Sequence, residues 1–455
     1  MTNFSAVILA AGSGTRMQSE IPKVLHKLSG KTLLKWVIDS VSKLKPDNIV
    51  IVLGHKSELV EKSLDGLNVK IVYQREQKGS AHALLQAKSA LENYKGNILV
   101  ISGDVPLIKS STISALLKYN SKNNHSASVL STIVDNPFGY GRIVKNKLNF
   151  EAIVEEKDAS QEEKNIKEIN SGIYCFDSGI WSVLSKIKPN NVKKEYYVTD
   201  SIAILKQEGK SVGLYKTDDN SEVKGINNRK ELAETENIIQ DRKIQELLQK
   251  GVSFINPKAV YISADAQIGQ DTIIYPGAYI ANNVKIGKNC IIEGSSYIAD
   301  SKIADGVFIS YSYIKGAVIE KGAHIGPFSH IRPESHLKEN VKVGNFSEIK
   351  KSTIEKGAKV NHLSYIGDAN IGKAVNIGAG TITCNFDGYK KHKTKIGDNV
   401  FVGSNVNLVA PVKVGKNALI AAGSTITRDI PPHQLAIARA KQQHLSKEIL
   451  KSFKK

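Results

Sequence analysis

The chain of 455 residues has few cysteines and no long hydrophobic run. Its three cysteines, Cys175, Cys290 and Cys384, are far apart and odd in number, so they predict neither a disulfide framework nor a metal-ligand spacing. No apolar run reaches the length of about eighteen residues that a membrane helix needs, so we expect no membrane insertion. The N-terminus lacks the basic start of a signal peptide. These absences favour a cytoplasmic protein.

Acidic residues are scarce relative to basic ones, with 63 Lys and Arg against 44 Asp and Glu and a net charge of +19. The lysines are scattered, and the only concentrated basic run is "YKKHKTK", residues 389–395. The sequence has no recognised nucleic-acid motif and little aromatic interleaving, so we do not expect nucleic acid as the main partner. A basic scaffold that binds nucleic acid remains the non-catalytic alternative. Anionic small substrates explain part of the excess charge.

The length predicts more than one domain, and the first half has an α/β pattern. Strand-like apolar runs at 4–12, 48–54 and 96–104 alternate with segments of helical periodicity at 31–44 and 80–94. This order is typical of an open, mostly parallel, Rossmann-like sheet, which binds ligands at the carboxyl ends of its strands. We assign residues 1–227 to this domain. The polar, helix-patterned segment 228–251 is predicted to be a linker.

Residues 252–455 have a different periodicity. Aliphatic side chains recur every sixth residue, beginning with Ile262, Ile268, Ile274, Ile280, Ile286, Ile292 and Ile298, and glycine often follows them. A sustained six-residue repeat predicts a hexapeptide parallel β-helix with an inward aliphatic ladder and about nine coils. The repeat is interrupted between Ile377 and Ile396, which predicts a protruding loop, "TCNFDGYKKHKTK", as a functional candidate.

A glycine-rich motif, "LAAGSGTRM", follows the first predicted strand from residue 9, and "PKVL" comes shortly after it. Gly12 and Gly14 allow the backbone to approach a phosphate closely, while Arg16 and Lys23 supply positive charge. The motif lacks the third glycine of the dinucleotide fingerprint, and it does not match the phosphate loop of the ATPases. It therefore predicts a phosphate site of another kind.

Several polar residues could complete a site in the first half. Asp104, at the end of a predicted strand, could hold Mg²⁺ against phosphates, although a turn or helix-cap role is equally consistent with the sequence. Glu155, Asn170 and Asn227 are polar residues with apolar neighbours. Each of them also fits a turn or an edge position.

The second half offers a candidate general base. Acetyl transfer to an amine needs a proton acceptor, and His362 is suited to that role. A lone histidine on a repeat is more often a surface residue. Tyr365, Asn376 and Asn385 follow it in a segment that is unusually polar for a β-helix, which favours a site.

The glycine motif with "PKVL" resembles the signature of nucleotidyltransferases that make nucleotide-sugars. Together with the hexapeptide half, the whole chain resembles the bacterial bifunctional GlmU family. The resemblance implies that the C-terminal domain, a left-handed β-helix, transfers acetyl from acetyl-CoA to glucosamine-1-phosphate. The N-terminal domain would then transfer uridyl from UTP to N-acetylglucosamine-1-phosphate and release pyrophosphate. The product, UDP-N-acetylglucosamine, supplies peptidoglycan and lipopolysaccharide synthesis. The resemblance also implies a Mg²⁺ cofactor and a homotrimer.

The resemblance assigns residues of the first half to the uridyltransferase site. Arg16 and Lys23 would act on the phosphate charge, and Asp104 and Asn227 would hold Mg²⁺. The UTP and UDP-sugar site would consist of Leu9, Ala10, Ala11, Gly12, Lys23, Gln74, Gly79, Ser80, Ser102, Gly103, Asp104, Gly141, Glu155, Asn170 and Asn227. Ser102 and Ser80 stand where the family more often has tyrosine and threonine.

The acetyltransferase residues are assigned in the same way. His362 would be the proton acceptor. Arg332, Lys350, Tyr365 and Asn376 would bind the sugar phosphate, with Asn385 beside the sugar. The acetyl-CoA site would consist of Ala379, Asn385, Phe386, Ser404, Ala422 and Arg439, with Lys391 near it. Phe386 replaces the usual tyrosine.

One enzymatic alternative remains open. The chain could be a sugar-nucleotide pyrophosphorylase with a single activity, whose β-helix only assembles the oligomer. A structural β-helix would not need His362, Arg332, Lys350 or the loop within 378–395, so these residues distinguish the two hypotheses.

Overall fold

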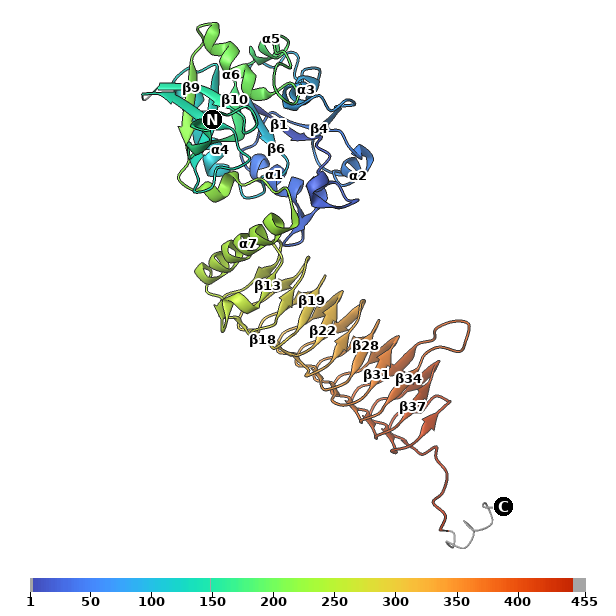
Figure 1. The fold of residues 1–455 in the computed structure, drawn as a ribbon. Helices are drawn as coiled ribbons and strands as arrows, with labels where there is room; N and C mark the ends of the chain where they lie inside the picture. Colours follow the sequence, from blue (N-terminus) through green and yellow to red (C-terminus); the bar gives the residue numbers. More distant parts are fainter. Residues whose placement is uncertain (1–2, 148, 445–455) are drawn as a thin grey trace, which may run out of the picture. The chain divides into compact units, whose positions relative to one another are not determined.

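The computed structural model describes residues 3–147 and 149–444 (Figure 1). The chain divides into two compact units, Met1–Ile239 and Gln240–Lys455, which are described separately below. Helix α7 (Arg229–Gln249) contains the division. No helix in the described part of the chain is long and apolar enough to cross a membrane. The basic C-terminal tail from residue 447 lies outside the described residues.

The first unit contains a nine-stranded mixed sheet. Its strands are β1 (Phe4–Ala10), β4 (Asn48–Leu53), β5 (Lys70–Tyr73), β6 (Asn97–Ser102), β7 (Ala127–Ile133), β8 (Arg142–Asn146), β9 (Asn149–Val154), β10 (Glu168–Phe176) and β11 (Val212–Lys216). The helices are α1 (Leu33–Ser42), α2 (Ser57–Lys62), α3 (Ser80–Gln86), α4 (Ser110–Lys122), α5 (Ile180–Leu184) and α6 (Val198–Gln207). A small pair, β2 (Lys27–Leu28) and β3 (Lys31–Thr32), lies outside this sheet.

The strand order is β11-β7-β10-β6-β1-β4-β5, with β8 and β9 off this path. Strands β6, β1, β4 and β5 are parallel, as the sequence predicts, whereas β10 runs antiparallel to β6 and β7. Successive residues of β1 face opposite sides of the sheet. Ile8 packs with α1, α2 and α4, and Val7 packs with α3, α5 and α6. Helices therefore cover both faces, and the carboxyl ends of β1 and β6 lie side by side.

The predicted helices and strands agree closely with the observed elements, but the helix predicted at 80–94 is too long. Helix α3 ends at Gln86 and not at Tyr94, and turns fill the remainder of the predicted segment. Helix α7 begins at Arg229 and ends at Gln249, close to the predicted limits of 228 and 251.

The second unit is a parallel β-helix with three faces, which we call faces 1, 2 and 3. Face 1 consists of β12 (Ser253–Phe254), β15 (Ile273–Ile274), β18 (Ile291–Glu293), β21 (Phe308–Ser310), β24 (His324–Ile325), β27 (Lys342–Val343), β30 (Lys359–Val360), β33 (Asn376–Ile377), β36 (Phe401–Val402), β39 (Leu419–Ile420) and β41 (Leu435–Ala436). Face 2 consists of β13 (Tyr261–Ile262), β16 (Tyr279–Ile280), β19 (Tyr297–Ala299), β22 (Tyr313–Lys315), β25 (His330–Ile331), β28 (Glu348–Lys350), β31 (Tyr365–Gly367), β34 (Ile382–Cys384), β37 (Asn407–Val409) and β40 (Thr425–Ile426). Face 3 consists of β14 (Gln267–Ile268), β17 (Lys285–Ile286), β20 (Lys302–Ile303), β23 (Ala317–Ile319), β26 (Ser335–Leu337), β29 (Thr353–Ile354), β32 (Ala369–Ile371), β35 (Thr394–Ile396) and β38 (Val412–Val414).

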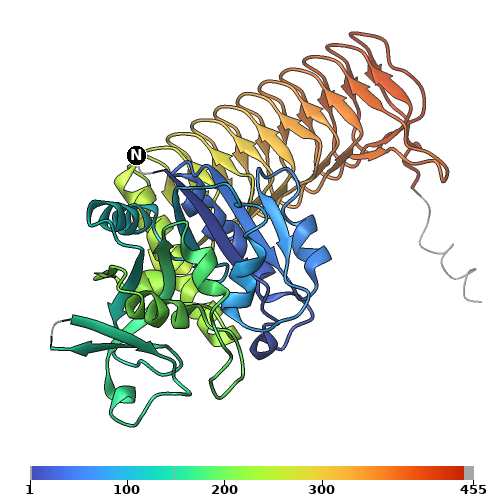
Figure 2. The ribbon, with the colours of Figure 1, turned by 90° about the horizontal axis from the view of Figure 1, so that it is seen from above.

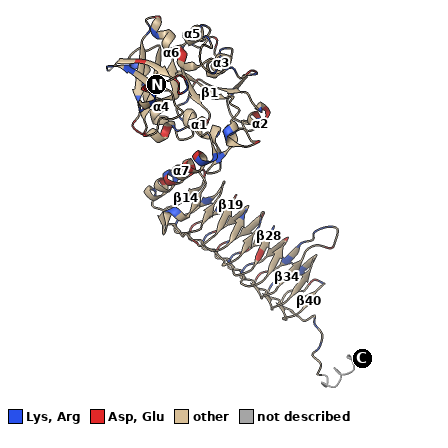
Figure 3. Ribbon diagram, in the orientation of Figure 1, with Lys and Arg blue, Asp and Glu red and all other residues tan. Residues whose placement is uncertain are grey.

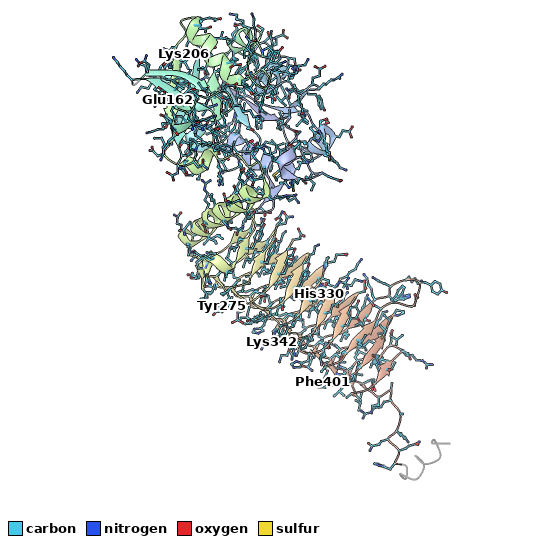
Figure 4. All side chains as sticks on the ribbon, in the orientation of Figure 1. Glu162, Lys206, Tyr275, His330, Lys342 and Phe401 are labelled. Atoms are coloured by element: carbon cyan, nitrogen blue, oxygen red, sulfur yellow. The ribbon has the colours of Figure 1, made fainter. Side chains whose placement is uncertain are left out.

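The aliphatic repeat forms the core of this unit. Ile262 pairs with Ile280, and Ile280 with Ile298, so each coil places one aliphatic side chain from every face inward. Figure 2 shows the coils stacked along the axis. The strand pairing also aligns the outward residues of successive coils, such as Tyr261, Tyr279 and Tyr297. His330 belongs to face 2, whereas Lys342 and Phe401 belong to face 1 (Figure 4). Each complete coil contributes one strand to each face. The three sheets have 11, 10 and 9 strands, so two of the faces extend slightly beyond the nine coils that the repeat predicts.

The predicted loop is present between faces 2 and 3 of one coil. Strand β34 ends at Cys384 and β35 begins at Thr394, so the insertion is residues 385–393, shorter than the predicted 383–395. It projects from the β-helix beside the β34 label in Figure 1. Figure 3 shows lysine and arginine dispersed along the ribbon of both units.

Candidate active sites

The glycine motif forms a loop immediately after β1. Gly14 has φ of +62°, and a Cβ atom there would lie 2.7 Å from the Cβ of Lys23. Gly12 has no such conformation and faces open space. The two glycines thus have different roles. Gly14 lets the loop turn tightly against the Lys23 segment, and Gly12 leaves room for a ligand.

Four of the predicted phosphate and metal residues converge beside this loop. The Lys23 ammonium forms an ion pair with the Asp104 carboxylate, and its Nζ lies 3.3 Å from Asn227 Oδ1. Arg16 donates to the same Asn227 oxygen at 2.9 Å. Asp104 is largely buried at the end of β6, and Arg16 is exposed. The residues in contact within this group are 81, 204 and 211 positions apart in the sequence, so the fold brings the group together.

A cavity of about 530 Å³ opens over the ends of β1 and β6. Ten of the predicted residues line it: Leu9, Ala11, Gly12, Gln74, Gly79, Ser80, Ser102, Gly141, Glu155 and Asn170. Ala10 and Gly103 do not line the cavity. Both are buried beneath it, and the Gly103 amide donates to the Leu9 carbonyl at 2.9 Å. The other three residues of the predicted list, Lys23, Asp104 and Asn227, form the charged group beside the glycine loop and do not line the cavity either.

Two glutamine side chains form hydrogen bonds to the backbone that lines the cavity. Buried Gln74 donates through Nε2 to the Gly79 carbonyl at 3.0 Å and lies 3.1 Å from His82 Nδ1. Gln77 donates to the Ala11 carbonyl at 3.0 Å. Gly79 has φ of +110°, and a Cβ there would lie 2.5 Å from the Tyr196 carbonyl oxygen. Only glycine fits that position, which fixes the start of α3 against the Gln74 amide.

The lining of the cavity also includes a half-buried carboxyl group and an amide. Glu155 Oε1 accepts a hydrogen bond from the Thr199 hydroxyl at 3.2 Å. Burial raises the pKa of Glu155 above its ordinary value. Asn170 donates to the Tyr174 hydroxyl at 2.7 Å, and burial likewise raises the pKa of that phenol. These polar groups can orient the hydroxyl and amide groups of a sugar.

Sequence reasoning missed several residues of this cavity. The additional lining residues are Ser13, Gln77, Ala83, Gly139, Tyr140, Ser171, Gly172, Tyr174, Glu195, Val198 and Thr199. Thr199 is the clearest case, since it contacts Glu155 from the first turn of α6. Neither its spacing nor its neighbours distinguish it from a threonine at the start of any helix.

The site residues include oxygen ligands suited to Mg²⁺. Among the described residues there is no group of three or more His, Cys, Asp or Glu side chains that could hold a metal by themselves. Mg²⁺ is commonly held by one or two carboxylates together with substrate phosphates, so a full protein cage is not required. One cation, the Lys23 ammonium, contacts both the Asp104 and Asn227 oxygens. The two oxygens therefore lie close enough for a single bound cation to contact both.

In the second unit, His362 lies at the corner between faces 1 and 2. Its Nδ1 lies 2.6 Å from Asn345 Oδ1, on the adjacent coil. An amide oxygen can only accept, so Nδ1 carries the hydrogen, and in the neutral ring Nε2 then has the free lone pair. Sequence reasoning missed Asn345, which sets this tautomer. A cavity of about 270 Å³ lies beside the pair.

Three predicted acetyl-CoA residues continue along the same corner. Ala379, Ser404 and Ala422 each follow a face 1 strand in successive coils, and backbone bonds join each of these coils to the next. Arg439 donates to the Ala422 carbonyl at 2.6 Å. The corner therefore presents His362 and these residues in one column.

The predicted sugar-phosphate residues lie mostly on face 2 and its other edge. Arg332 is paired with Glu348 at 2.7 Å. Asn385 donates to Asp368 at 2.6 Å and lies 3.4 Å from the Tyr365 hydroxyl. All of these groups lie within a few coils of one another.

The loop contributes positive charge to this edge. Lys350 lies close enough to Lys391 that its ammonium lowers the pKa of Lys391. Two adjacent ammonium groups favour the binding of an anion between them. Phe386 is exposed in the loop, and Asn376 points outward from face 1, away from the face 2 group. Among the predicted sugar-binding residues, Asn376 is therefore the one that lies apart from the rest within a single chain.

The fold and sites define a transferase with two catalytic units. Residues 6–158 match the model of the MobA-like NTP transferase domain, and residues 265–300, 316–351 and 393–428 match bacterial transferase hexapeptide repeats. The hexapeptide match identifies the second unit as a left-handed β-helix.

Curated relatives match the chain along nearly all of its length. It is 46% identical to the "Bifunctional protein GlmU" of Syntrophomonas wolfei over 98% of this chain and 99% of that protein. It is 47% identical to the GlmU of Caldicellulosiruptor saccharolyticus over 96% of this chain and 95% of that protein. A third GlmU, from Listeria monocytogenes serotype 4a, is 46% identical over 98% of this chain. The chain belongs to the GlmU family, and it is a bifunctional nucleotidyltransferase and acetyltransferase.

Proposed function

We propose that the first unit joins UTP and N-acetylglucosamine-1-phosphate in the cavity over β1 and β6. The observation that carries this proposal is the convergence of Arg16, Lys23, Asp104 and Asn227 beside the glycine loop, whose residues Gly12 and Ser13 line the cavity. Gln74 and the Gly79 backbone would bind the uracil, and Glu155 with Asn170 would bind the sugar; all four residues line the cavity.

The reaction needs no protein nucleophile. A phosphate oxygen of the sugar phosphate attacks the α-phosphorus of UTP, and pyrophosphate leaves. Lys23 and Arg16 neutralise charge on the phosphates, and the cavity holds both substrates in line. Mg²⁺, held by Asp104 and Asn227, would supply further neutralisation of phosphate charge.

The second unit acetylates glucosamine-1-phosphate at the face 2 edge. His362 Nε2 takes a proton from the sugar amine, and Asn345 keeps the opposite nitrogen protonated. Arg332, Lys350 and Lys391 bind the sugar phosphate, with Tyr365, Asn376 and Asn385 on the sugar. The acetyl-CoA lies along the column of Ala379, Ser404 and Ala422, near Arg439, whereas Asn385 and Phe386 lie at the other edge of face 2 in the same chain.

We propose that the acetyltransferase site is completed in a homotrimer. One chain places His362 at one edge of face 2 and the loop with Lys391 at the other edge. Exposed apolar side chains also form a column at the corner of faces 1 and 2: Tyr311, Phe328, Phe346 and Leu363. Such a column favours contact with another copy of the chain. All three cysteines are free, which supports a cytoplasmic location.

Two substitutions test this assignment. Asp104→Asn should reduce uridyl transfer by about a hundredfold or more and leave acetyl transfer unchanged, because it removes a carboxylate from the phosphate site. His362→Asn should do the reverse, because it removes the proton acceptor. Free thiol release with glucosamine-1-phosphate and acetyl-CoA, and pyrophosphate release with N-acetylglucosamine-1-phosphate, UTP and Mg²⁺, report the two reactions in separate assays. Loss of both activities in either folded variant would contradict two separate sites.

A further inference from the structure

We propose that Glu231 is a positioning residue for uridyl transfer. It holds the backbone of Asn227 so that the Asn227 amide oxygen faces the phosphates and the metal. This inference rests on the proposed function of the first unit. Glu231 lies in the first turn of α7 and was not among the residues that the sequence suggested.

The contacts of Glu231 are directed at the residues just before the helix. Its Oε2 accepts a hydrogen bond from the Asn227 backbone N–H at 2.7 Å. Its Oε1 accepts from Asn228 Nδ2 at 2.7 Å, and Asn228 Oδ1 accepts from the Glu231 N–H at 2.9 Å. This reciprocal arrangement resembles a capping box, but one carboxylate oxygen reaches the residue that precedes the cap.

The hydrogen bond between the Asn227 N–H and Glu231 matters because the backbone is then held on both sides of Asn227. On its N-terminal side, the N–H of buried Ile226 donates to the Asp104 carbonyl at 3.0 Å. On its C-terminal side the Glu231 carboxylate takes the Asn227 N–H. The Asn227 side chain then meets both Arg16 and Lys23. Glu231 therefore acts on the reacting groups through Asn227, in the way that outer hydrogen bonds orient metal ligands.

The same helical turn also contacts the Lys23 segment. Arg229 NH1 lies 3.1 Å from His26 Nδ1, and the His26 N–H donates to the Lys23 carbonyl at 3.2 Å. The start of α7 thus supports two segments that are distant in sequence, and it sets them side by side. A cap whose only purpose was to begin the helix would not need these contacts.

The test compares Glu231→Ala and Glu231→Gln with Glu234→Ala. Glu234 is a matched control on the same helix, because it is exposed and forms an ion pair with Lys224 at 2.6 Å. Mg²⁺ is titrated against each variant with UTP but without sugar phosphate, and calorimetry measures binding in the absence of turnover. Steady-state uridyl transfer and acetyl transfer are measured on the same preparations.

We expect Glu231→Ala to raise the apparent Kd for Mg²⁺ by about 10- to 100-fold and to lower the kcat of uridyl transfer. Glu231→Gln should recover part of both, since its amide oxygen can still accept the Asn227 N–H. Acetyl transfer should be unchanged in every variant, and Glu234→Ala should match the unaltered enzyme.

Two outcomes would overturn the inference. One is a folded Glu231→Ala that keeps its Mg²⁺ affinity and kcat, even with a lower melting temperature, because Glu231 would then only stabilise the helix. If Glu231→Ala does not fold, the second outcome decides: a folded Glu231→Gln whose Mg²⁺ binding and turnover are unaltered would also overturn the inference. Asp104→Asn, run in parallel, separates this failure from that of the proposed function. If Asp104→Asn also keeps binding and turnover, the site assignment itself is wrong.

Discussion

At the residue scale, the phosphate site depends on a few backbone conformations as much as on its charges. Gly14 adopts a left-handed conformation in contact with Lys23, and Gly12 does not. The ammonium of Lys23 in turn contacts Asp104 and Asn227. The position of one cation is therefore set by a glycine nine residues earlier in the chain.

We predict that alanine at Gly14 lowers the stability of the protein, whereas alanine at Gly12 affects only substrate binding. Gly14→Ala should lower the free energy of unfolding by about 1–2 kcal/mol, because an L-residue is disfavoured in this conformation. It should also displace Lys23 and reduce uridyl transfer. Gly12→Ala should leave the melting temperature unchanged, since its Cβ meets nothing within 4 Å. It should nevertheless raise the KM for UTP, because the methyl group enters the cavity. Equal melting temperatures for the two variants would contradict this reading of the loop.

At the element scale, the loop at residues 385–393 is held by its own side chains. Asp387 accepts the N–H groups of Tyr389 and Lys390, each at 2.8 Å, and lies 2.6 Å from His392 Nε2. These contacts hold the pKa of Asp387 well below its usual range. The His392 N–H donates to the Asn385 carbonyl at 2.8 Å, and this hydrogen bond between His392 and Asn385 closes the loop at its base.

His392→Ala is therefore predicted to loosen the loop that carries Lys391. The KM for glucosamine-1-phosphate in acetyl transfer should rise severalfold, and uridyl transfer should not change. Tyr389→Ala is the matched control, because the Tyr389 side chain is almost fully exposed and only its backbone N–H contacts Asp387. Substrate-saturation curves for both reactions give the answer. A rise in KM for Tyr389→Ala as large as that for His392→Ala would argue against the His392 contact.

The elements also show what a sequence can predict here. The β-helix follows from the repeat alone, because an aliphatic residue at every sixth position fixes which side chain of each strand is buried. The strand ends that carry the cavity follow from the βαβ pattern in the same way. The antiparallel course of β10 does not follow from it, because an apolar run has the same pattern in either direction.

The candidate sites were less predictable than the fold. The residues of the glycine motif were found because their spacing is restrictive. Glu231, Thr199 and Asn345 were not found, because each acts through a tertiary contact with another site residue. Nothing in their local sequence separates them from ordinary polar residues at a helix start or a turn.

At the scale of the whole molecule, each unit has its own hydrophobic core. Leu116 belongs to the cluster beneath α1, α2 and α4 in the first unit, and Ile292 belongs to the ladder of the second. Both side chains are fully buried, and neither residue is among the predicted site residues. Removing buried carbon atoms from one core costs about 2–5 kcal/mol, and the cost applies to the unit that contains the core.

We therefore predict that heat inactivates the two reactions separately in core variants. Leu116→Ala should lower the temperature at which uridyl transfer is lost and should leave acetyl transfer intact at that temperature. Ile292→Ala should act on acetyl transfer instead, although less sharply, because a β-helix distributes its stability along neighbouring coils. Residual activity is measured for both reactions after brief heating of the full-length protein. If both activities disappear at the same temperature in both variants, the units unfold together, and the separate cores do not set their stability.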